Sequence, residues 1–221
     1  MMKRYFYTKT MVMTIATLTL FSTATFAAQT SQQAISNLQK EWAVDNYQLK
    51  DDAQEAAFTQ LMKKADEDVA TFSDDAGIHI WRGIIYSTYA GITGGIGALK
   101  YAKSAKSDFE KALSLDPLAL KGSAYTSLGM LYLRVPGWPI GFGDDDKAQS
   151  LLKKGLKANP NGIDANYFYA QYLMEEDEYK QANNYLEKAL LAHARPTRPL
   201  ADKGRREDIQ NSLADIKKEL E

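Results

Sequence analysis

The sequence predicts an all-α protein in which antiparallel helix pairs stack as an α-solenoid and end in a C-terminal capping helix. Three observations predict this fold class. Apolar residues recur at spacings of three and four over several stretches, which is the period of an amphipathic helix. Prolines follow these stretches at Pro117, Pro160 and Pro196, and proline stops helices. The stretches are also similar to one another, which indicates that one structural unit recurs along the chain.

Residues 1–27 are predicted to be a secretory signal peptide that is cleaved near Ala27. Lys3 and Arg4 precede an uncharged, mostly apolar run over residues 11–26, and small residues follow it. The alternative is an uncleaved membrane anchor, which the short and threonine-rich run disfavours. We therefore expect the mature chain to be periplasmic, with no stable membrane anchor after cleavage.

The composition excludes several classes of function. The 221 residues include 27 Lys and Arg, 28 Asp and Glu, two His and no Cys. Without Cys there is no disulfide, thiol nucleophile or thiolate metal site, and His79 and His193 alone are a poor basis for a histidine-built site. A net charge of -1 provides no basic excess for phosphates. We expect no catalytic residues, no metal, no cofactor and no nucleic acid.

The mature chain, residues 28–221, is expected to form one helical domain because no linker rich in Pro, Gly and Ser divides it. The expected elements are an N-terminal helix pair at 31–72, repeats at about 75–117, 122–160 and 163–196, and a capping helix at about 201–220. The apolar residues that define the first pair are Ile35, Leu38, Trp42, Phe58, Leu61, Met62, Ala65, Val69 and Phe72. Those of the capping helix are Ile209, Leu213, Ile216 and Leu220, and its charged residues are expected to form a solvated face.

The second helix of each repeat carries the same pattern of small and large residues. The aligned sets are Ala105, Phe109, Ala112 and Pro117; Ala148, Leu152, Gly155 and Pro160; and Ala182, Leu186 and Ala189, with Ala194 in place of the proline. This pattern resembles the tetratricopeptide repeat. The resemblance implies close helix pairs, because small residues let two helices approach while large residues fill the groove between them.

The first helices align on the small residues Gly83, Gly129 and Ala170. Arg82 stands where the family usually has an apolar residue, so the first repeat is the least typical. A strand beginning near Ile78 is the alternative there, and the repeat register disfavours it.

The repeats differ in length. Ala148 and Ala182 lie 34 residues apart, as in the family, but Ala105 and Ala148 lie 43 apart. Extra residues are predicted in the turns within two units, at 91–97 and 135–146. The glycines of the first turn do not match a phosphate-binding loop. The acidic residues at 144–146 are predicted to cap the next helix rather than to bind calcium.

The loop sequence Pro-Gly-Trp-Pro-Ile-Gly-Phe-Gly-Asp at 136–144 provides a narrower resemblance. An exported chain of such repeats with this loop is similar to the T component of tripartite ATP-independent periplasmic transporters. This resemblance implies association with a periplasmic solute-binding protein. The loop is expected to fold back onto the repeats, with Trp138 over the binding groove.

The family resemblance also implies which residues line a concave groove for a ligand. Most are first-helix residues at fixed offsets from the small residue, and Trp138 joins them from the loop: Ile80, Ile84, Ser87, Thr88, Thr126, Met130, Leu133, Arg134, Trp138, Tyr167, Gln171, Met174 and Glu175. Arg134 is the strongest single candidate because a guanidinium pairs with a carboxylate through two hydrogen bonds. The alternative is that Arg134 only anchors its loop by pairing with Asp144.

These observations leave three functions to compare. The first is a non-catalytic scaffold that binds a protein or peptide partner in the groove. The second is a small-ligand-binding accessory of a periplasmic transport system. The third is an enzyme, which the sequence disfavours because it offers no paired acid and base, nucleophile signature or metal cluster.

Overall fold

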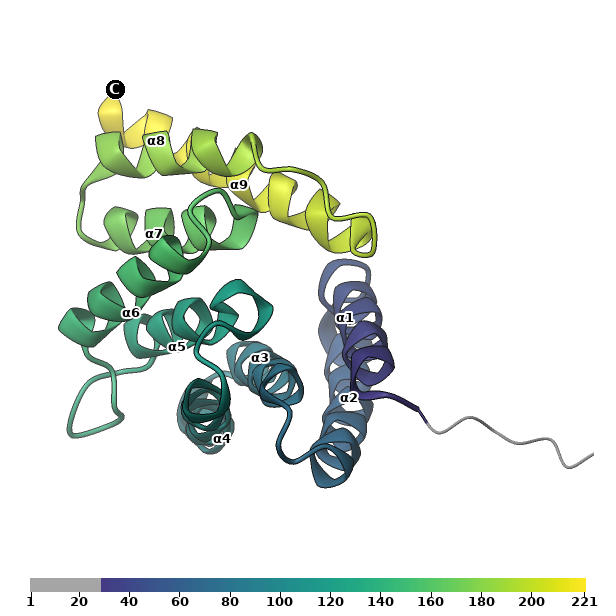
Figure 1. Ribbon diagram of the computed structural model, residues 1–221. Helices are drawn as coiled ribbons and strands as arrows, with labels where there is room; N and C mark the ends of the chain where they lie inside the picture. The colour runs from purple at the N-terminus through teal and green to yellow at the C-terminus, as the bar shows by residue number, and fades with distance from the viewer. Residues whose placement is uncertain (1–28) are drawn as a thin grey trace, which may run out of the picture.

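The computed structural model describes residues 29–221, so the predicted signal peptide lies outside the described residues. Within that range the chain forms nine α-helices, one short 3₁₀ helix and no strand (Figure 1). The elements are α1 Ser31–Tyr47, α2 Asp51–Thr71, α3 Ala76–Thr93, α4 Gly95–Leu115, η1 Ala119–Lys121, α5 Ser123–Arg134, α6 Asp145–Ala158, α7 Ile163–Glu175, α8 Tyr179–Leu190 and α9 Pro199–Leu220. The all-α prediction is confirmed. The strand alternative near Ile78 is wrong, because Ile78 lies in α3.

Consecutive helices pack as pairs, and α3 with α4, α5 with α6, and α7 with α8 make the most extensive contacts. The first helices also contact one another, α1 with α3, α3 with α5, and α5 with α7. This arrangement is the helical solenoid that the repeats predict. One wall of the stack therefore consists of α1, α3, α5 and α7.

Small residues bring paired helices together as the repeat pattern requires. A Cβ atom on Gly83 would lie 2.6 Å from Cε1 of Phe109, and one on Gly129 would lie 2.8 Å from Cγ of Leu152. Contacts this short are closer than carbon atoms tolerate, so only glycine fits at these two positions without a shift of the neighbour. Phe109 and Leu152 are themselves buried in the core.

The glycine-rich segment at 91–97 is not an inserted turn. Residues 91–93 end α3, residues 95–97 begin α4, and Gly94 joins the two helices with φ at 60°. The prediction of an insertion in the turn is wrong because the extra residues lengthen the helices. Helices α3 and α4 have 18 and 21 residues, whereas α5 and α6 have 12 and 14.

The predicted loop between α5 and α6 is present over residues 135–144. Asp144 caps α6 by accepting a hydrogen bond from the backbone N–H of Lys147 at 3.0 Å, which confirms the capping role. Phe142 packs edge-on against Tyr132, with ring centroids 5.6 Å apart. Trp138 is 90% exposed, so the expectation that it folds back onto the repeats is wrong. Phe142 makes the inward contact instead.

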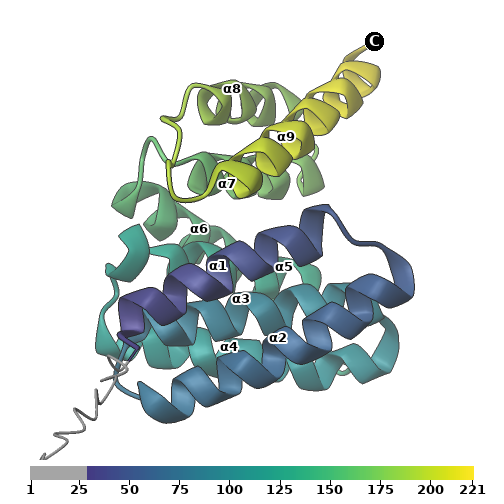
Figure 2. The same ribbon diagram turned by 90° about the vertical axis from the view of Figure 1, so that its right-hand side faces the viewer.

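The capping helix α9 contacts α7 and α8 and also reaches α1 (Figure 1). Figure 2 shows α9 running across α7 to the C-terminus, which lies away from α1. Gly204 allows this approach, because a Cβ there would lie 2.3 Å from the ring of Tyr47. The hydroxyl of Tyr47 donates to Asp208 Oδ2 at 3.1 Å. The first and last helices of the described chain therefore contact each other, and α9 does more than cover the last repeat.

Among the described helices, none combines the length and the hydropathy needed to span a membrane.

Candidate functional site

A cavity of about 740 Å³ lies between the first helices of the pairs and α9. Its walls come from α1, α3, α5 and the first turns of α7, and from α9 with the loop that precedes it. Part of the lining is apolar or aromatic: Trp42, Trp81, Ile84, Met130, Leu131 and Phe168. Hydroxyl groups lie among these side chains: Ser87, Thr88, Ser123, Thr126 and Ser127. Such a mixture of apolar surface and a few polar groups is typical of ligand sites.

Six of the thirteen predicted groove residues line this cavity, and all six lie on α3 or α5: Ile84, Ser87, Thr88, Thr126, Met130 and Arg134. The hydroxyl of Thr88 also accepts a hydrogen bond from the indole of Trp42 at 3.0 Å. This bond joins α1 to α3 at the cavity wall.

The other seven predicted residues do not line the cavity: Ile80, Leu133, Trp138, Tyr167, Gln171, Met174 and Glu175. Ile80 is fully buried beside Ala112 and Ala124 in the core. On α7, the capping helix contacts two of the predicted residues, Tyr167 and Gln171. Gln171 donates to Ser212 of α9 at 3.0 Å, and Cζ of Arg205 lies 4.4 Å from the ring centroid of Tyr167.

Arg134 pairs with Glu175 through Nη1 at 2.6 Å, and its Nη2 lies 3.4 Å from Oε1 of Gln171. Three predicted site residues thus contact one another across α5 and α7. The alternative that Arg134 anchors its loop through Asp144 is wrong, because Asp144 pairs with Lys147 at 2.7 Å. Arg134 links two repeats at the rim of the cavity.

Charged residues near the C-terminus form a wall of the cavity that the sequence did not predict. Asp164 of α7 accepts from Arg195 at 2.5 Å and from Arg205 at 3.0 Å. Burial alone would raise the pKa of Asp164, but the two arginines hold that pKa well below its usual range. The prediction that Arg205 belongs to a solvated face is wrong, because its guanidinium packs against Tyr167 and Phe168.

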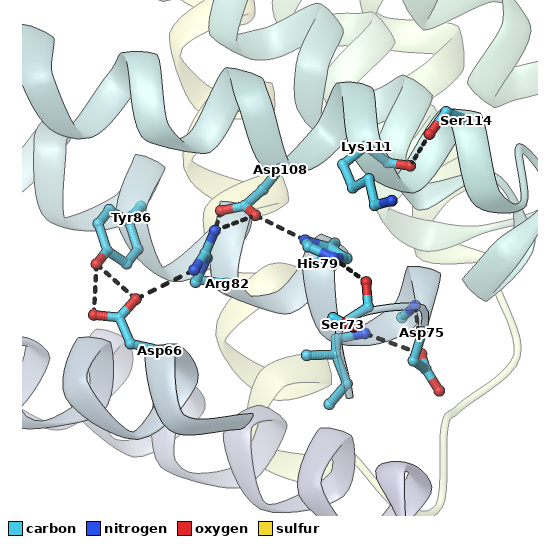
Figure 3. Close-up of polar contacts among 11 residues, drawn as sticks. Asp66, Ser73, Asp75, His79, Arg82, Tyr86, Asp108, Lys111 and Ser114 are labelled. Atoms are coloured by element: carbon cyan, nitrogen blue, oxygen red, sulfur yellow. Dashed lines mark hydrogen bonds and ion pairs between the residues drawn. The ribbon is translucent and has the colours of Figure 1, made fainter. Parts of the chain in front are cut away.

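A second polar cluster lies away from the cavity, between α2, α3 and α4 (Figure 3). Asp108 is 1% exposed and accepts two hydrogen bonds from Arg82, at 2.8 and 2.7 Å. Its Oδ1 also lies 2.9 Å from Nδ1 of His79, whose Nε2 lies 2.9 Å from the carbonyl oxygen of Ser73. Arg82 also approaches Asp66 of α2, with 3.5 Å between Nη1 and Oδ1.

This cluster accounts for Arg82 at a position where the family pattern expects an apolar residue. The guanidinium holds the buried Asp108 carboxylate, and the imidazole ties α3 to the loop before it. Each ring nitrogen of His79 faces an oxygen atom, Oδ1 of Asp108 on one side and the carbonyl oxygen of Ser73 on the other. The cluster joins α2, α3 and α4, and its polar side chains bind one another.

In residues 29–221, no three His, Asp or Glu side chains come together as the ligands of a metal ion would.

Comparison with known proteins gives a family match for part of the chain. The model of the family described as Tetratricopeptide repeat matches residues 140–201. No curated protein matches the sequence at a significant level.

Several solved structures are similar in fold. A thermophilic tetratricopeptide-repeat protein of Thermus thermophilus has 14% identity and a TM-score of 0.54, with 84% of this chain and 100% of that chain covered. Yeast Tom70 has 16% identity and a TM-score of 0.48, with 88% of this chain and 39% of Tom70 covered. The family match indicates tetratricopeptide repeats over residues 140–201, and the paired helices of the described chain have the fold of such repeat proteins.

Proposed function

We propose that this protein is a non-catalytic, exported scaffold that binds a protein or peptide partner in its central cavity. Tetratricopeptide-repeat proteins typically bind protein partners. The observation that carries the proposal is the cavity of about 740 Å³, which receives residues from the first helix of every pair. Six of its residues occupy positions at which the family resemblance places a ligand. The partner would contact the apolar wall and the hydroxyl groups on α3 and α5.

The test is affinity capture from periplasmic extract with a variant that fills the cavity. Ser127 lies in the lining on α5, so Ser127→Phe is expected to reduce capture of the partner at least about tenfold by occupying its site. The matched control is Ser150→Phe, which adds the same ring to an exposed position on α6 outside the lining. Thermal melting of both variants checks that the fold is kept.

If Ser127→Phe and Ser150→Phe reduce capture equally, or if neither reduces it, the partner binds outside the cavity. A supporting result is loss with Ser127→Phe alone. For the partner itself, a periplasmic solute-binding protein is the first candidate to look for among the captured proteins, because the loop at 136–144 implies it.

Export is proposed from the leader at residues 1–27. The mature protein is expected to begin near Ala28, and N-terminal sequencing of the protein purified from its native cells measures this. A mature sequence that begins at Met1 would contradict export with cleavage.

A second candidate function is a small-ligand-binding accessory of a periplasmic transport system. The contact between α9 and α1 favours it, because this contact bounds the cavity on the side where a solenoid groove would otherwise stay open. Native mass measurement distinguishes the two functions: a retained small molecule supports the accessory, and its absence beside a captured protein supports the scaffold.

A further inference from the structure

The tip of the loop between α5 and α6 presents two apolar side chains to solvent. Trp138 is 90% exposed and Ile140 is 63% exposed. Ile96, in the first turn of α4, is also exposed. The loop lies against this part of α4, because a Cβ atom on Gly141 would be 3.4 Å from Cδ2 of Leu99. Large apolar side chains that are exposed together, rather than singly, mark interaction surfaces.

The loop is ordered although its largest side chain is exposed. Phe142 packs against Tyr132 at its base. The backbone is held by four hydrogen bonds of 3.0 or 3.1 Å, which are donated by the N–H groups of Ile140, Gly141, Gly143 and Asp144. A segment that is ordered before binding loses little conformational freedom on association. Trp138 is therefore a preorganised side chain of the kind that anchors protein interfaces.

Exposed carboxylates continue from the loop along the same side of the molecule. Figure 1 shows the loop, the first turn of α6, the turn between α7 and α8, and the C-terminus on its left-hand side. We define the acidic strip as six exposed acids of these segments that form no ion pair within residues 29–221: Asp145, Asp146, Glu176, Asp177, Glu178 and Glu219. Lys180 is exposed among them, so the strip keeps a net negative charge.

Two tyrosines show that the carboxylates of the acidic strip lie close together. Burial raises the pKa of Tyr172, and three carboxylates of the strip raise it further. These three belong to Glu176, Asp145 and Asp146. The hydrogen bond to Asp177 raises the pKa of Tyr179, and the charge of Glu219 acts in the same direction. The strip therefore continues from α6 through the turn after α7 to the end of α9.

The fold accounts for only some of these acids. Asp145 and Asp146 lie in the first turn of α6, where the positive end of the helix dipole favours a carboxylate. Glu176 directly follows α7 and Glu219 lies in the last turn of α9. The negative end of a helix dipole disfavours a carboxylate at both places. Their positions thus favour a positively charged partner over a local structural role.

We propose that the loop tip and the acidic strip form a second interaction surface, which docks a protein partner that carries an apolar pocket within a cationic surface. Trp138 enters the pocket, and the strip attracts and orients the cationic groups around it. None of these residues belongs to the lining of the central cavity, so this surface goes beyond the proposed function. A membrane fits less well as the occupant, because the exposed carboxylates repel anionic lipids.

The first test is calorimetric titration of the mature protein with a synthetic amphipathic helical peptide built of Leu and Lys, which offers apolar and cationic groups together. The matched peptide built of Leu and Glu is expected to bind at least about tenfold more weakly, because its charges repel the strip. Equal binding of the two peptides, or no binding of the Leu-Lys peptide, would overturn the proposal.

The second test measures the same titration with Trp138→Ala. This variant is expected to bind the Leu-Lys peptide at least about tenfold more weakly, because a buried anchor carries much of the binding free energy of an interface. The matched control is Leu191→Ala, which removes an exposed apolar side chain at the end of α8 and is expected to bind as the parent does. Unchanged binding by Trp138→Ala, or an equal loss in both variants, would contradict the role of the loop tip.

The third test removes two charges of the strip with the double variant Glu176→Gln and Glu219→Gln. Binding of the Leu-Lys peptide is expected to weaken severalfold at low ionic strength, and the difference from the parent is expected to shrink as salt is added. The control is Glu67→Gln with Asp74→Asn, which removes the same charge at the end of α2 and in the turn after it. An equal loss in the two double variants, or no loss in the first, would show that the strip does not recognise the peptide.

Thermal melting checks that these losses do not come from unfolding. Because Glu176 and Glu219 lie at negative helix ends, replacing both is expected to leave the melting temperature equal or higher. A melting temperature far below that of the parent would show that these acids are structural and would overturn their assignment to the surface.

Ser127→Phe distinguishes this surface from the cavity of the proposed function. Binding of the Leu-Lys peptide is expected to be unchanged by Ser127→Phe, whatever happens to capture of the cavity partner. Binding that is lost in Ser127→Phe and kept in Trp138→Ala would place the peptide in the cavity, which supports the scaffold and overturns the second surface.

Sedimentation with vesicles of zwitterionic and anionic lipids tests the membrane as the occupant. The mature protein is expected to stay in solution with both. Sedimentation with the vesicles that Trp138→Ala abolishes would assign the loop tip to a lipid surface and overturn the proposal.

Discussion

Helix pairs α3–α4 and α5–α6 share the same contact between a small and a large residue, but the pair of residues beside it differs. In α3–α4, Arg82 and the buried Asp108 form a partly buried ion pair with two hydrogen bonds. The aligned residues of α5–α6 are Leu128 and Leu151, which belong to one apolar cluster. The contact at glycine fixes how closely the helices approach. The neighbouring positions hold either an ion pair or two apolar side chains.

The third pair, α7–α8, has yet another combination at the same two positions. Tyr169 and Tyr185 pack edge to face there, with ring centroids 4.8 Å apart. An ion pair, two leucines and two tyrosines thus occupy equivalent places in three units. Because only the small residue is restricted by space, the repeat tolerates this variation.

A similarity between the first and third units is less visible in the sequence. Nε2 of His79 lies 2.9 Å from the carbonyl oxygen of Ser73, and Nδ2 of Asn166 donates to that of Pro160 at 3.0 Å. Each side chain binds the carbonyl six residues before it and so fixes the chain just ahead of the first helix. Tyr125 stands at this position in the middle unit. Different side chains therefore perform one capping task at the same place in the repeat.

The largest expected effect breaks the ion pair of the first unit. Asp108→Ala removes the shared acceptor of Arg82 and His79 and is expected to reduce the free energy of unfolding by about 3 kcal/mol, because a partly buried guanidinium and a buried imidazole lose their hydrogen-bond partner. Urea denaturation of the purified mature protein measures this.

The control converts the first unit to the chemistry of the second. The double substitution Arg82→Leu with Asp108→Leu is expected to regain part of the stability lost in Asp108→Ala, since it removes the unpaired guanidinium and packed apolar residues often replace an ion pair without loss, whereas His79 still lacks its acceptor. A double variant that is as unstable as Asp108→Ala would show that the two units are not interchangeable at this position.

The next effect concerns the contact that the units share. Gly83→Ala and Gly129→Ala are each expected to cost about 1–3 kcal/mol, because the new methyl group collides with Phe109 or Leu152. The control is Gly97→Ala at an exposed site in α4, where a Cβ would meet nothing within 4 Å. That change is expected to be neutral or to stabilise by up to about 1 kcal/mol, because alanine favours the helix. Urea denaturation of all three variants measures these changes. Equal changes in the free energy of unfolding would contradict the claim that the contact at glycine sets how closely the helices pack.

This shared contact also explains how much of the fold the sequence predicts. Small and large residues at fixed spacing, with prolines after them, specify helix pairs through local rules alone. The positions on α3 and α5 that line the cavity follow from the same register. The glycine-rich segment at 91–97 was wrongly predicted to be an inserted turn. The number of residues between two small positions of the pattern does not distinguish a longer loop from longer helices.

The rest of the site depends on contacts that no local pattern encodes. Tyr47 contacts Asp208 across a sequence separation of 161 residues, and Ile209 and Ile216 pack α9 over α7. Tyr167 and Gln171 are therefore covered although their register points to the groove. Arg195, Arg198 and Arg205 enter the lining for the same reason. In the sequence, Arg205 belongs to a charged stretch of a terminal helix, and Arg195 and Arg198 precede that helix.

The smallest expected effects concern the loop at 135–144, which is present in the middle unit, where the ion pair of the first unit is replaced by leucines. The loop is held against the helices by its backbone, since Asp144 N–H donates to the carbonyl of Tyr132 at 3.1 Å, and by the ring of Phe142.

Phe142→Ala is expected to cost about 1–2 kcal/mol, because half-buried apolar area and an aromatic contact are lost. Trp138→Ala is expected to change the free energy of unfolding by less than about 0.5 kcal/mol, because the indole is 90% exposed. Urea denaturation of the two variants measures both values. A loss with Trp138→Ala as large as that with Phe142→Ala would mean that the indole packs on the repeats in solution, and that the middle unit is stabilised by the whole loop rather than by Phe142.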